Sequence, residues 1–339
     1  MQEPVTLQDI ADRVGVARGT VSSALSGKGR ISAETRDRIR ATAEELGYVA
    51  NTVARNLRVS RSGSIGLHVP DDPLSYPFYM AVVYGVVTRA QEEGILVTVV
   101  PKSISNDTRF EDHLDGFIVI DPHDGDEMAA RLLRGRRPVV SGEAPPADVP
   151  APAAIVTSDN HAGATELVRH LVDRGARSVL GVIAPPVAAW SREVAAGFHL
   201  AVEDSGIRST TIILGPDVGP EQISEQIAAA VTDDVDAVLC AAEGTALIAL
   251  QTLTKMGRRV GVDILLASWP DSLALSATIP SVSSIDLRAR AIGAACVEAL
   301  IEAIEEAANT SANAPTSTRT IHVPYELVLR DSTRRLTGR

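Results

Sequence analysis

Acidic and aromatic side chains stand directly after several apolar segments of this 339-residue chain. The segments have the composition of buried strands, and the side chains that follow them are Asp71, Tyr76, Phe78, Asp121, Glu243, Trp269 and Asp271. Carboxylates accept hydrogen bonds from hydroxyl groups, and aromatic faces pack against C–H groups, so this set suits a polyhydroxylated ligand such as a sugar or polyol. The alternative for any single acid is that it caps a helix or faces water.

A second group of polar side chains lies between residues 17 and 28. Its outward positions are Arg18, Gly19, Ser22 and Ser23, among which Arg18 is the only long donor and could contact guanine O6 and N7 in bidentate fashion. The hydroxyls and amine suited to phosphates belong to Thr20, Ser22, Ser26 and Lys28. The alternative is a solvated arginine with hydroxyls on an ordinary helical bundle.

Three short helices must position that second group. Thr6, with Asp9 three residues later, predicts a capped helix over 6–14, which Gly15 ends. A second helix is expected from Ala17, and Ser32 caps a third that ends at Gly47. This spacing is typical of a helix-turn-helix, whose second helix enters the major groove of DNA.

The formal charge of −11 argues against a nucleic-acid partner only for the chain as a whole. Residues 1–60 carry a net charge of about +2, and the remainder carries about −13. Only the N-terminal part therefore suits a polyanion.

From residue 64 onward, apolar strand segments alternate with amphipathic helices in two successive sets. This alternation predicts parallel α/β sheets in two lobes with a cleft between them. A Pro- and Ala-rich stretch at 144–154 is expected as a loop before the first crossing, and HVPYELVL at 322–329 is expected as the last strand.

The predicted fold class is α/β, with an all-α helix-turn-helix head and a two-lobed body of parallel sheets. The expected divisions are a head at 1–50, a hinge helix at 51–60 and a body at 61–339, with one lobe at about 63–157 and 286–320 and the other at about 158–285 and 321–339.

Residues 5–58 closely resemble the head of the LacI/GalR family of bacterial repressors. The resemblance rests on Thr20-Val21-Ser22, on Glu45 to Tyr48 and on the hinge segment from Asn51 to Leu57. It implies that two hinge helices lie in the minor groove and that Leu57 inserts between base pairs. The DNA-contacting residues that we expect are Thr6, Arg18, Gly19, Thr20, Ser22, Ser23, Ser26, Lys28, Asn51, Ala54, Arg55 and Leu57.

Residues 64–335 resemble the periplasmic-binding-protein-like body of the same family. Thr157-Ser158-Asp159-Asn160 is similar to a Ser-Asp-Asn segment at the lobe crossing, which implies that Asp159 belongs to the effector site. The arginine common in the family falls on Val194, and Arg192 stands two residues earlier as the substitute that we expect. Because Glu243 and Trp269-Pro270-Asp271 also depart from the family pattern, ordinary hexose recognition does not follow.

Several classes of protein do not fit the sequence. It contains no P-loop, GxSxG, HExxH or paired-cysteine signature, so we expect no enzyme activity, no metal and no cofactor. The N-terminus lacks the order of a signal peptide and no apolar run could span a membrane, which predicts a cytoplasmic protein and excludes a secreted solute-binding protein. Cys240 and Cys296 are interpreted as buried packing residues, and His68 as a packed strand residue.

Together these features predict a transcriptional repressor that binds a palindromic operator as a homodimer and is controlled by a small polar effector, a sugar or polyol. A regulator of the same fold that responds to a nucleoside, to a partner protein or to no small molecule is the alternative. Without a heptad repeat at its C-terminal end, the chain is expected to form dimers rather than tail-linked tetramers. The sequence does not indicate whether the effector releases DNA or promotes its binding.

Overall fold

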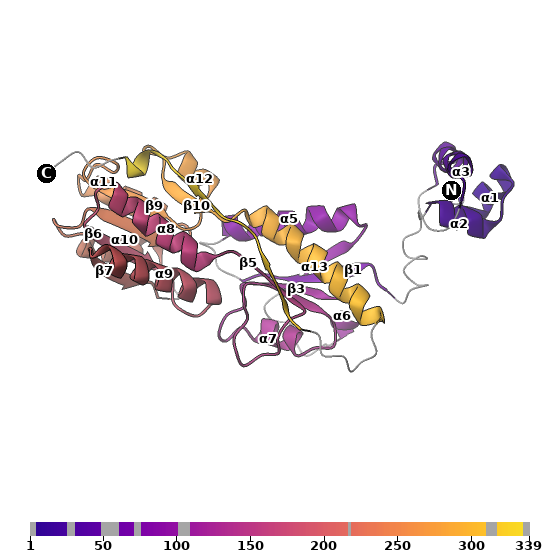
Figure 1. The fold of residues 1–339 in the computed structure, drawn as a ribbon, viewed down its shortest axis with the longest axis horizontal. Coiled ribbons are helices and arrows are strands. Elements are labelled where there is room, and N and C mark those ends of the chain that lie inside the picture. Colours follow the sequence, from indigo (N-terminus) through magenta and orange to yellow (C-terminus); the bar gives the residue numbers. More distant parts are fainter. Residues whose placement is uncertain are drawn as a thin grey trace. The chain divides into compact units, whose positions relative to one another are not determined.

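The computed structural model describes residues 5–25, 31–48, 61–70, 76–100, 109–215, 218–309 and 317–334. The chain forms two compact units, residues 1–60 and 61–339 (Figure 1). The expected hinge at 51–60 lies outside the described residues.

Three helices form the first unit: α1 (Leu7–Val14), α2 (Arg18–Leu25) and α3 (Ala33–Glu45). They enclose a small core around Ile10, Val21 and Ile39, each of which is fully buried. A core of this size supports a three-helix unit because each helix buries one apolar face against the other two.

Local sequence sets the helix ends in this unit. The Thr6 hydroxyl accepts a hydrogen bond from the Asp9 amide, and the Asp9 carboxylate accepts one from the Thr6 amide at 2.7 Å. Gly15 ends α1 in a left-handed conformation at φ 76°, and the Ser32 hydroxyl caps α3 by accepting from the Thr35 amide. The capping box and both end signals expected from sequence are present.

The first sheet of the second unit is entirely parallel, in the order β11-β5-β4-β3-β1-β2. Its strands are β1 (Ser64–His68), β2 (Leu96–Val99), β3 (Phe117–Ile120), β4 (Val139–Gly142), β5 (Ala154–Thr157) and β11 (Arg319–His322). The helices of this lobe, the N-lobe, are α5 (Tyr76–Glu92), α6 (Arg109–Asp112), α7 (Glu127–Leu133) and α13 (Ala289–Asn309).

The second sheet has the order β12-β10-β9-β8-β6-β7 and is parallel except for β12, which pairs antiparallel with β10. Its strands are β6 (Ser178–Ile183), β7 (Arg208–Ile213), β8 (Ala237–Ala241), β9 (Leu265–Ser268), β10 (Ser283–Asp286) and β12 (Glu326–Val328). The remaining elements of this C-lobe are α8 (Asn160–Asp173), α9 (Ala189–Ser205), α10 (Pro220–Ala230), α11 (Thr245–Lys255), α12 (Leu273–Ser276) and the 3-10 turn η2 (Asp331–Thr333).

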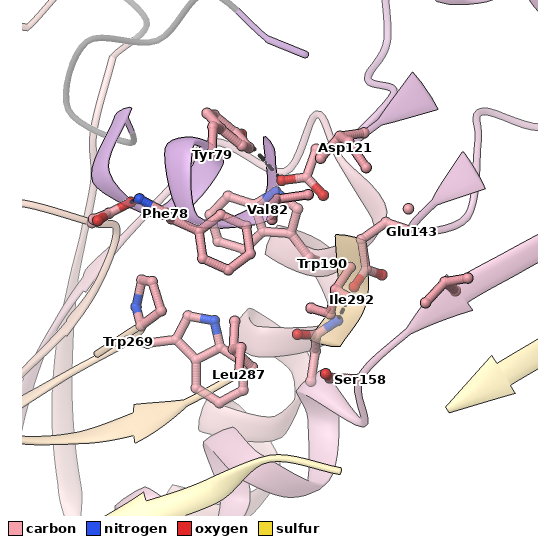
Figure 2. A pocket seen from close by; sticks show the side chains of 16 residues that line it. Phe78, Tyr79, Val82, Asp121, Glu143, Ser158, Trp190, Trp269, Leu287 and Ile292 are labelled. Carbon is pink, nitrogen blue, oxygen red and sulfur yellow. Dashed lines mark hydrogen bonds between the residues drawn. The ribbon is translucent and has the colours of Figure 1, made fainter. Parts of the chain in front are cut away.

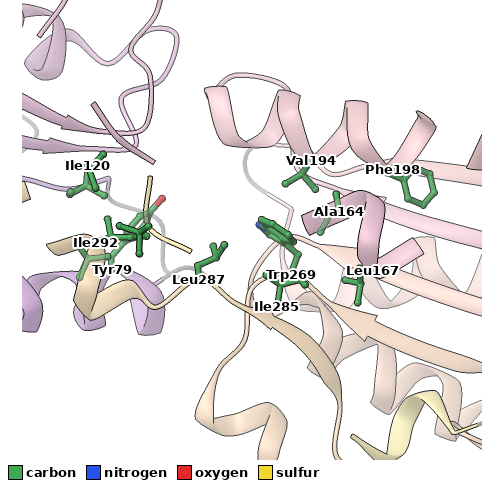
Figure 3. Packing of buried hydrophobic residues seen from close by; sticks show 14 of the residues in the cluster. Tyr79, Ile120, Ala164, Leu167, Val194, Phe198, Trp269, Ile285, Leu287 and Ile292 are labelled. Atoms are coloured by element: carbon green, nitrogen blue, oxygen red, sulfur yellow. The ribbon is translucent and has the colours of Figure 1, made fainter. Parts of the chain in front are cut away.

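The chain passes between the lobes three times: from β5 to α8, from β10 to α13 and from β11 to β12. One apolar cluster runs through both lobes and includes Ile120 and Ile292 on one side and Trp269 and Phe198 on the other (Figure 3). The paired parallel sheets and the helix-turn-helix head confirm the predicted fold class.

Two glycines let the long helices α5 and α13 pack closely against each other. A Cβ at Gly85 of α5 would overlap the carbonyl oxygen of Arg290, and a Cβ at Gly293 of α13 would overlap the carbonyl oxygen of Val82. Each helix therefore lies directly against the backbone of the other (Figure 1).

The expected last strand at 322–329 is wrong, because this segment divides between the two sheets. His322 ends β11 in the first sheet, and Glu326 begins β12 in the second. Pro324 lies between them, and a proline cannot donate the amide hydrogen bond that a continuous strand would need.

Within the described ranges, no helix has the length and apolar character needed to cross a membrane. Cys240 and Cys296 are buried and free, as expected.

Candidate functional site

A cavity lies between the carboxyl ends of the two sheets, where parallel sheets usually hold their ligands. Its polar lining includes Asp121, Glu143, Asn160 and Glu243, and its aromatic lining consists of Phe78, Tyr79, Trp190 and Trp269 (Figure 2). The space open to the centre of a water-sized sphere is about 40 Å³, enough for only a few water molecules.

Asp121 follows β3 directly, with its carboxylate turned toward the cavity (Figure 2). The Tyr79 hydroxyl donates a hydrogen bond to Asp121 Oδ2 at 3.0 Å. Burial, and then the nearby carboxylate of Glu143, raise the pKa of Asp121 well above its ordinary value.

Glu143 holds the equivalent position after the neighbouring strand β4. Its two carboxylate oxygens accept hydrogen bonds from Asn160 Nδ2 at 3.1 Å and from Thr157 Oγ1 at 2.8 Å. Burial raises the pKa of Glu143 despite these donors.

Both residues have left-handed backbones, with φ of 44° at Asp121 and 77° at Glu143. Side-chain-bearing residues rarely adopt this conformation, and such strain is concentrated at functional sites. The chain therefore bends sharply after two adjacent strands and directs both carboxylates into the same space.

Glu243 approaches from the C-lobe, after β8. Its Oε2 accepts a hydrogen bond at 3.3 Å from the amide of Phe78, in the first turn of α5. The carboxylate thus lies at the positive end of a helix that belongs to the other lobe.

Loops of the two lobes also meet beside the cavity. The Asp124 amide donates to the Val187 carbonyl at 2.9 Å, and His123 forms an isolated antiparallel bridge with Ala188. We call these contacts, together with the Phe78–Glu243 hydrogen bond, the lobe contacts.

The structure brings four of the predicted effector residues to the cavity: Phe78, Asp121, Glu243 and Trp269. Asp71 lies outside the described residues, and the side chain of Tyr76 is not described. These two remain predictions.

Three other predicted residues do not line the cavity because each is held by different partners. Asp159 is exposed and caps α8 by accepting from the Ala162 amide. Arg192 donates to the Pro186 carbonyl and lies 3.6 Å from Asp124, and Asp271 forms a bidentate pair with Arg330 at 2.7 and 2.8 Å.

His68 is buried and does not line the cavity. Its Nε2 lies 3.0 Å from Asp126 Oδ2, and its Nδ1 lies 3.2 Å from the Val100 carbonyl oxygen. It packs inside the N-lobe, as interpreted from sequence.

Glu143 is absent from the set expected from sequence. It follows the apolar segment PVVSG as Asp121 follows GFIVI, so the rule that selects Asp121 also selects Glu143. Asn160 and Trp190 lie in the first turns of α8 and α9. The expected set is drawn from acidic and aromatic side chains that follow strands, so it includes neither the amide of Asn160 nor Trp190, seven residues after β6.

In the head, Arg18 and Gly19 are exposed on α2, and Thr20, Ser22 and Ser23 are half-buried. The Thr6 hydroxyl is engaged in the capping box of α1. The other predicted DNA contacts, Ser26, Lys28, Asn51, Ala54, Arg55 and Leu57, lie outside the described residues.

A helix-turn-helix unit followed by a two-lobed body with a polar and aromatic cavity between its lobes defines a class of ligand-responsive DNA-binding regulators. The family model described as "Bacterial regulatory proteins, lacI family" matches residues 6–51, and the "Periplasmic binding protein-like domain" matches residues 168–333. The chain belongs to the LacI/GalR family of bacterial transcriptional regulators, a family of DNA-binding proteins rather than enzymes.

Individual relatives are similar over nearly the whole chain. The HTH-type transcriptional regulator CelR of Thermobifida fusca is 28% identical over 310 residues, 87% of this chain and 91% of CelR. A Lac repressor dimer bound to operator and the anti-inducer ONPF is similar with a TM-score of 0.70 and 25% identity, over 98% of this chain and 100% of that one. A CelR–cellobiose complex is similar with a TM-score of 0.69 and 25% identity, over 97% and 99% of the two chains.

Proposed function

We propose that this regulator is a cytoplasmic repressor that binds a palindromic operator as a homodimer and is controlled by a small polar effector, a sugar or polyol, in the inter-lobe cavity. The observation that carries the effector part is the cavity itself, where carboxylates and four aromatic rings converge at the carboxyl ends of both sheets. Carboxylates accept from hydroxyls while rings cover C–H faces.

The operator part is supported by the exposed face of α2. Arg18 and Gly19 lie at its first turn, the part of a recognition helix that contacts base edges. The similar Lac repressor was solved as a dimer on its operator, and two-fold protein symmetry requires a two-fold site.

The size of the cavity supports control through lobe movement. A space of about 40 Å³ for water centres is too small for a sugar ring, so the effector enters only when the lobe contacts open. An effector that binds one lobe arrangement better than another shifts the population toward it. Arg61, which follows the hinge segment directly, donates to the Ile304 carbonyl of α13, so the N-lobe holds the chain where the hinge ends.

Arg18→Ala tests the operator part. We expect it to weaken binding to the selected operator by about 1 to 3 kcal/mol per guanine contacted, with little change on random DNA. Operators are first selected from a random pool by the purified protein, and affinities are then measured by fluorescence anisotropy at fixed salt.

Lys28→Ala is the matched control, because a phosphate contact weakens specific and random DNA equally. Equal weakening of both DNAs by Arg18→Ala would contradict the base-reading role. Failure of the selection to yield any preferred palindrome would contradict operator binding as a whole.

A further inference from the structure

The described lining of the cavity is strongly one-sided in charge. It holds three carboxylates, Asp121, Glu143 and Glu243, and no lysine, arginine or histidine. Glu193 of α9 adds a fourth acid close enough to Glu143 to raise the pKa of that carboxyl.

The arginines nearest in the chain to the lining residues are engaged elsewhere. Arg192, two residues after Trp190, contacts the Pro186 carbonyl and Asp124. Arg288, next to Leu287, is paired with Glu326, and the guanidinium of Arg290, two residues before Ile292, lies over the ring of Tyr84. These arginines therefore have partners outside the cavity, and none of them belongs to its lining.

The two carboxylates on β3 and β4 are also held close to each other. The Asp121 amide donates to the Gly142 carbonyl at 2.7 Å, which ties Asp121 to the residue just before Glu143. The hydroxyl of Tyr79 and the side chains of Asn160 and Thr157 fix the two acids in place. Fixed like charges in a buried site repel each other, and a cation between them would remove the repulsion.

We propose that the effector carries a cationic nitrogen, as an amino sugar does, and that Asp121 and Glu143 bind its ammonium group while the aromatic side chains cover the face of its ring. This rests on the proposed function, in which the cavity is the effector site. An ammonium group has three N–H donors for two carboxylates, and its charge is also attracted to the faces of nearby aromatic rings. A hydroxyl at the same place donates one hydrogen bond and leaves the repulsion between the carboxylates in place.

The test compares sugars that differ only in the substituent at C2 of each ring. The full-length protein is titrated by calorimetry with glucose, glucosamine and N-acetylglucosamine, and with cellobiose, its 2,2′-diamino analogue and the N,N′-diacetyl form of that analogue. The galacto and manno monosaccharide sets extend the panel. We expect an amine to bind at least tenfold more tightly than its neutral counterparts and to change operator affinity.

Asp121→Asn and Glu143→Gln are expected to remove most of this preference, because each keeps the shape but loses a charge. Asp159→Asn is the matched control, since Asp159 is exposed outside the cavity, and it should keep the preference. Melting temperatures of the unliganded variants confirm that each is folded.

A pH series gives a second measurement. If Asp121 and Glu143 had only a structural role, the pH dependence of amine affinity would be the same in the wild type and in the variants. Both carboxyls have raised pKa values, so each takes up its proton at a higher pH than an ordinary carboxyl does. As the pH is lowered, amine affinity should fall in the wild type and less in the two variants, whereas affinity for a neutral sugar should not fall.

The outcomes separate the two proposals. If a neutral sugar binds as tightly as its amine or more tightly, the cationic effector is overturned and the proposed function stands. If no sugar of either kind binds or changes operator affinity, the sugar or polyol effector of the proposed function is overturned, and this inference with it.

Discussion

Asp121 and Glu143 combine backbone strain, burial and mutual repulsion at one point of the molecule. Each of these effects costs folding free energy. No described residue of the cavity lining carries a positive charge that would offset the repulsion between the two carboxylates. The residues that define the cavity are thus expected to lower stability in the absence of a ligand.

Asp121→Asn should therefore stabilise the unliganded protein at pH 7.5. The native pKa of Asp121 is raised, so the native state binds the proton more tightly than the unfolded state, and stability falls as pH rises from about 4 through the native pKa. Asparagine removes this loss, with an expected gain on the order of 1 kcal/mol at pH 7.5 and less at pH 5.

Urea unfolding at the two pH values measures the effect, and Asp159→Asn, which keeps its helix cap, should change little at either. A variant of Asp121 that is less stable than the wild type at pH 7.5 would contradict the assignment of a repelled, buried carboxylate.

For single residues, the sequence predicted which side chains follow a strand. It did not predict which of those side chains are paired with residues far away in the chain. Asp121, Glu243 and Trp269 reach the cavity because the carboxyl end of a buried strand is recognisable from its apolar run. Asp271 follows a strand too, but it is paired with Arg330, 59 residues later in the chain. No local pattern reveals such a pairing.

At the scale of elements, helix ends could be predicted from local sequence, whereas strand pairing could not. Thr6, Gly15 and Ser32 act on their own helices, and the structure has the ends that they predict. The division of residues 322–329 between β11 and β12 depends on which sheet has a free edge, and that is a property of the assembled fold.

The crossing of α5 and α13 yields a second stability prediction. Gly85→Ala should destabilise the protein by about 1 to 3 kcal/mol, because its Cβ would overlap backbone atoms of α13 that cannot move independently. Thr88→Ala, at an exposed position of the same helix, should change stability by only a few tenths of a kcal/mol.

Chemical denaturation of the two variants provides the comparison. An equally small effect for Gly85→Ala would mean that the two helices do not lie in direct backbone contact.

At the scale of the whole body, the proposed function requires the lobe contacts to open before the effector enters the cavity. His123 and Ala188 are bridge partners in an antiparallel pair, whose Cβ atoms are about 4.5 to 5.5 Å apart, close to the spacing that a disulfide spans. A His123→Cys/Ala188→Cys double variant should therefore lock the lobes together when oxidised.

In the oxidised variant we expect effector binding to be slowed at least tenfold, and reduction with dithiothreitol should restore the wild-type rate. The native thiols do not interfere, because both are buried and burial raises the pKa of Cys240 to about 12. Stopped-flow measurement with either single-cysteine variant as control checks the result, and unchanged binding in the oxidised double variant would rule out lobe opening as the entry step.

The three crossings between lobes also affect the order in which the protein can fold during synthesis. Most of the N-lobe sequence leaves the ribosome first, but α13 and the edge strand β11 of that lobe follow the strands β6 to β10 of the C-lobe. The buried side chains of Cys296, Val297 and Leu300 on α13 complete the apolar cluster that Ile65 and Leu67 begin. The N-lobe is translated first but cannot complete its fold until α13 and β11 have been synthesised. Part of its apolar core therefore stays exposed until nearly the whole chain has been made.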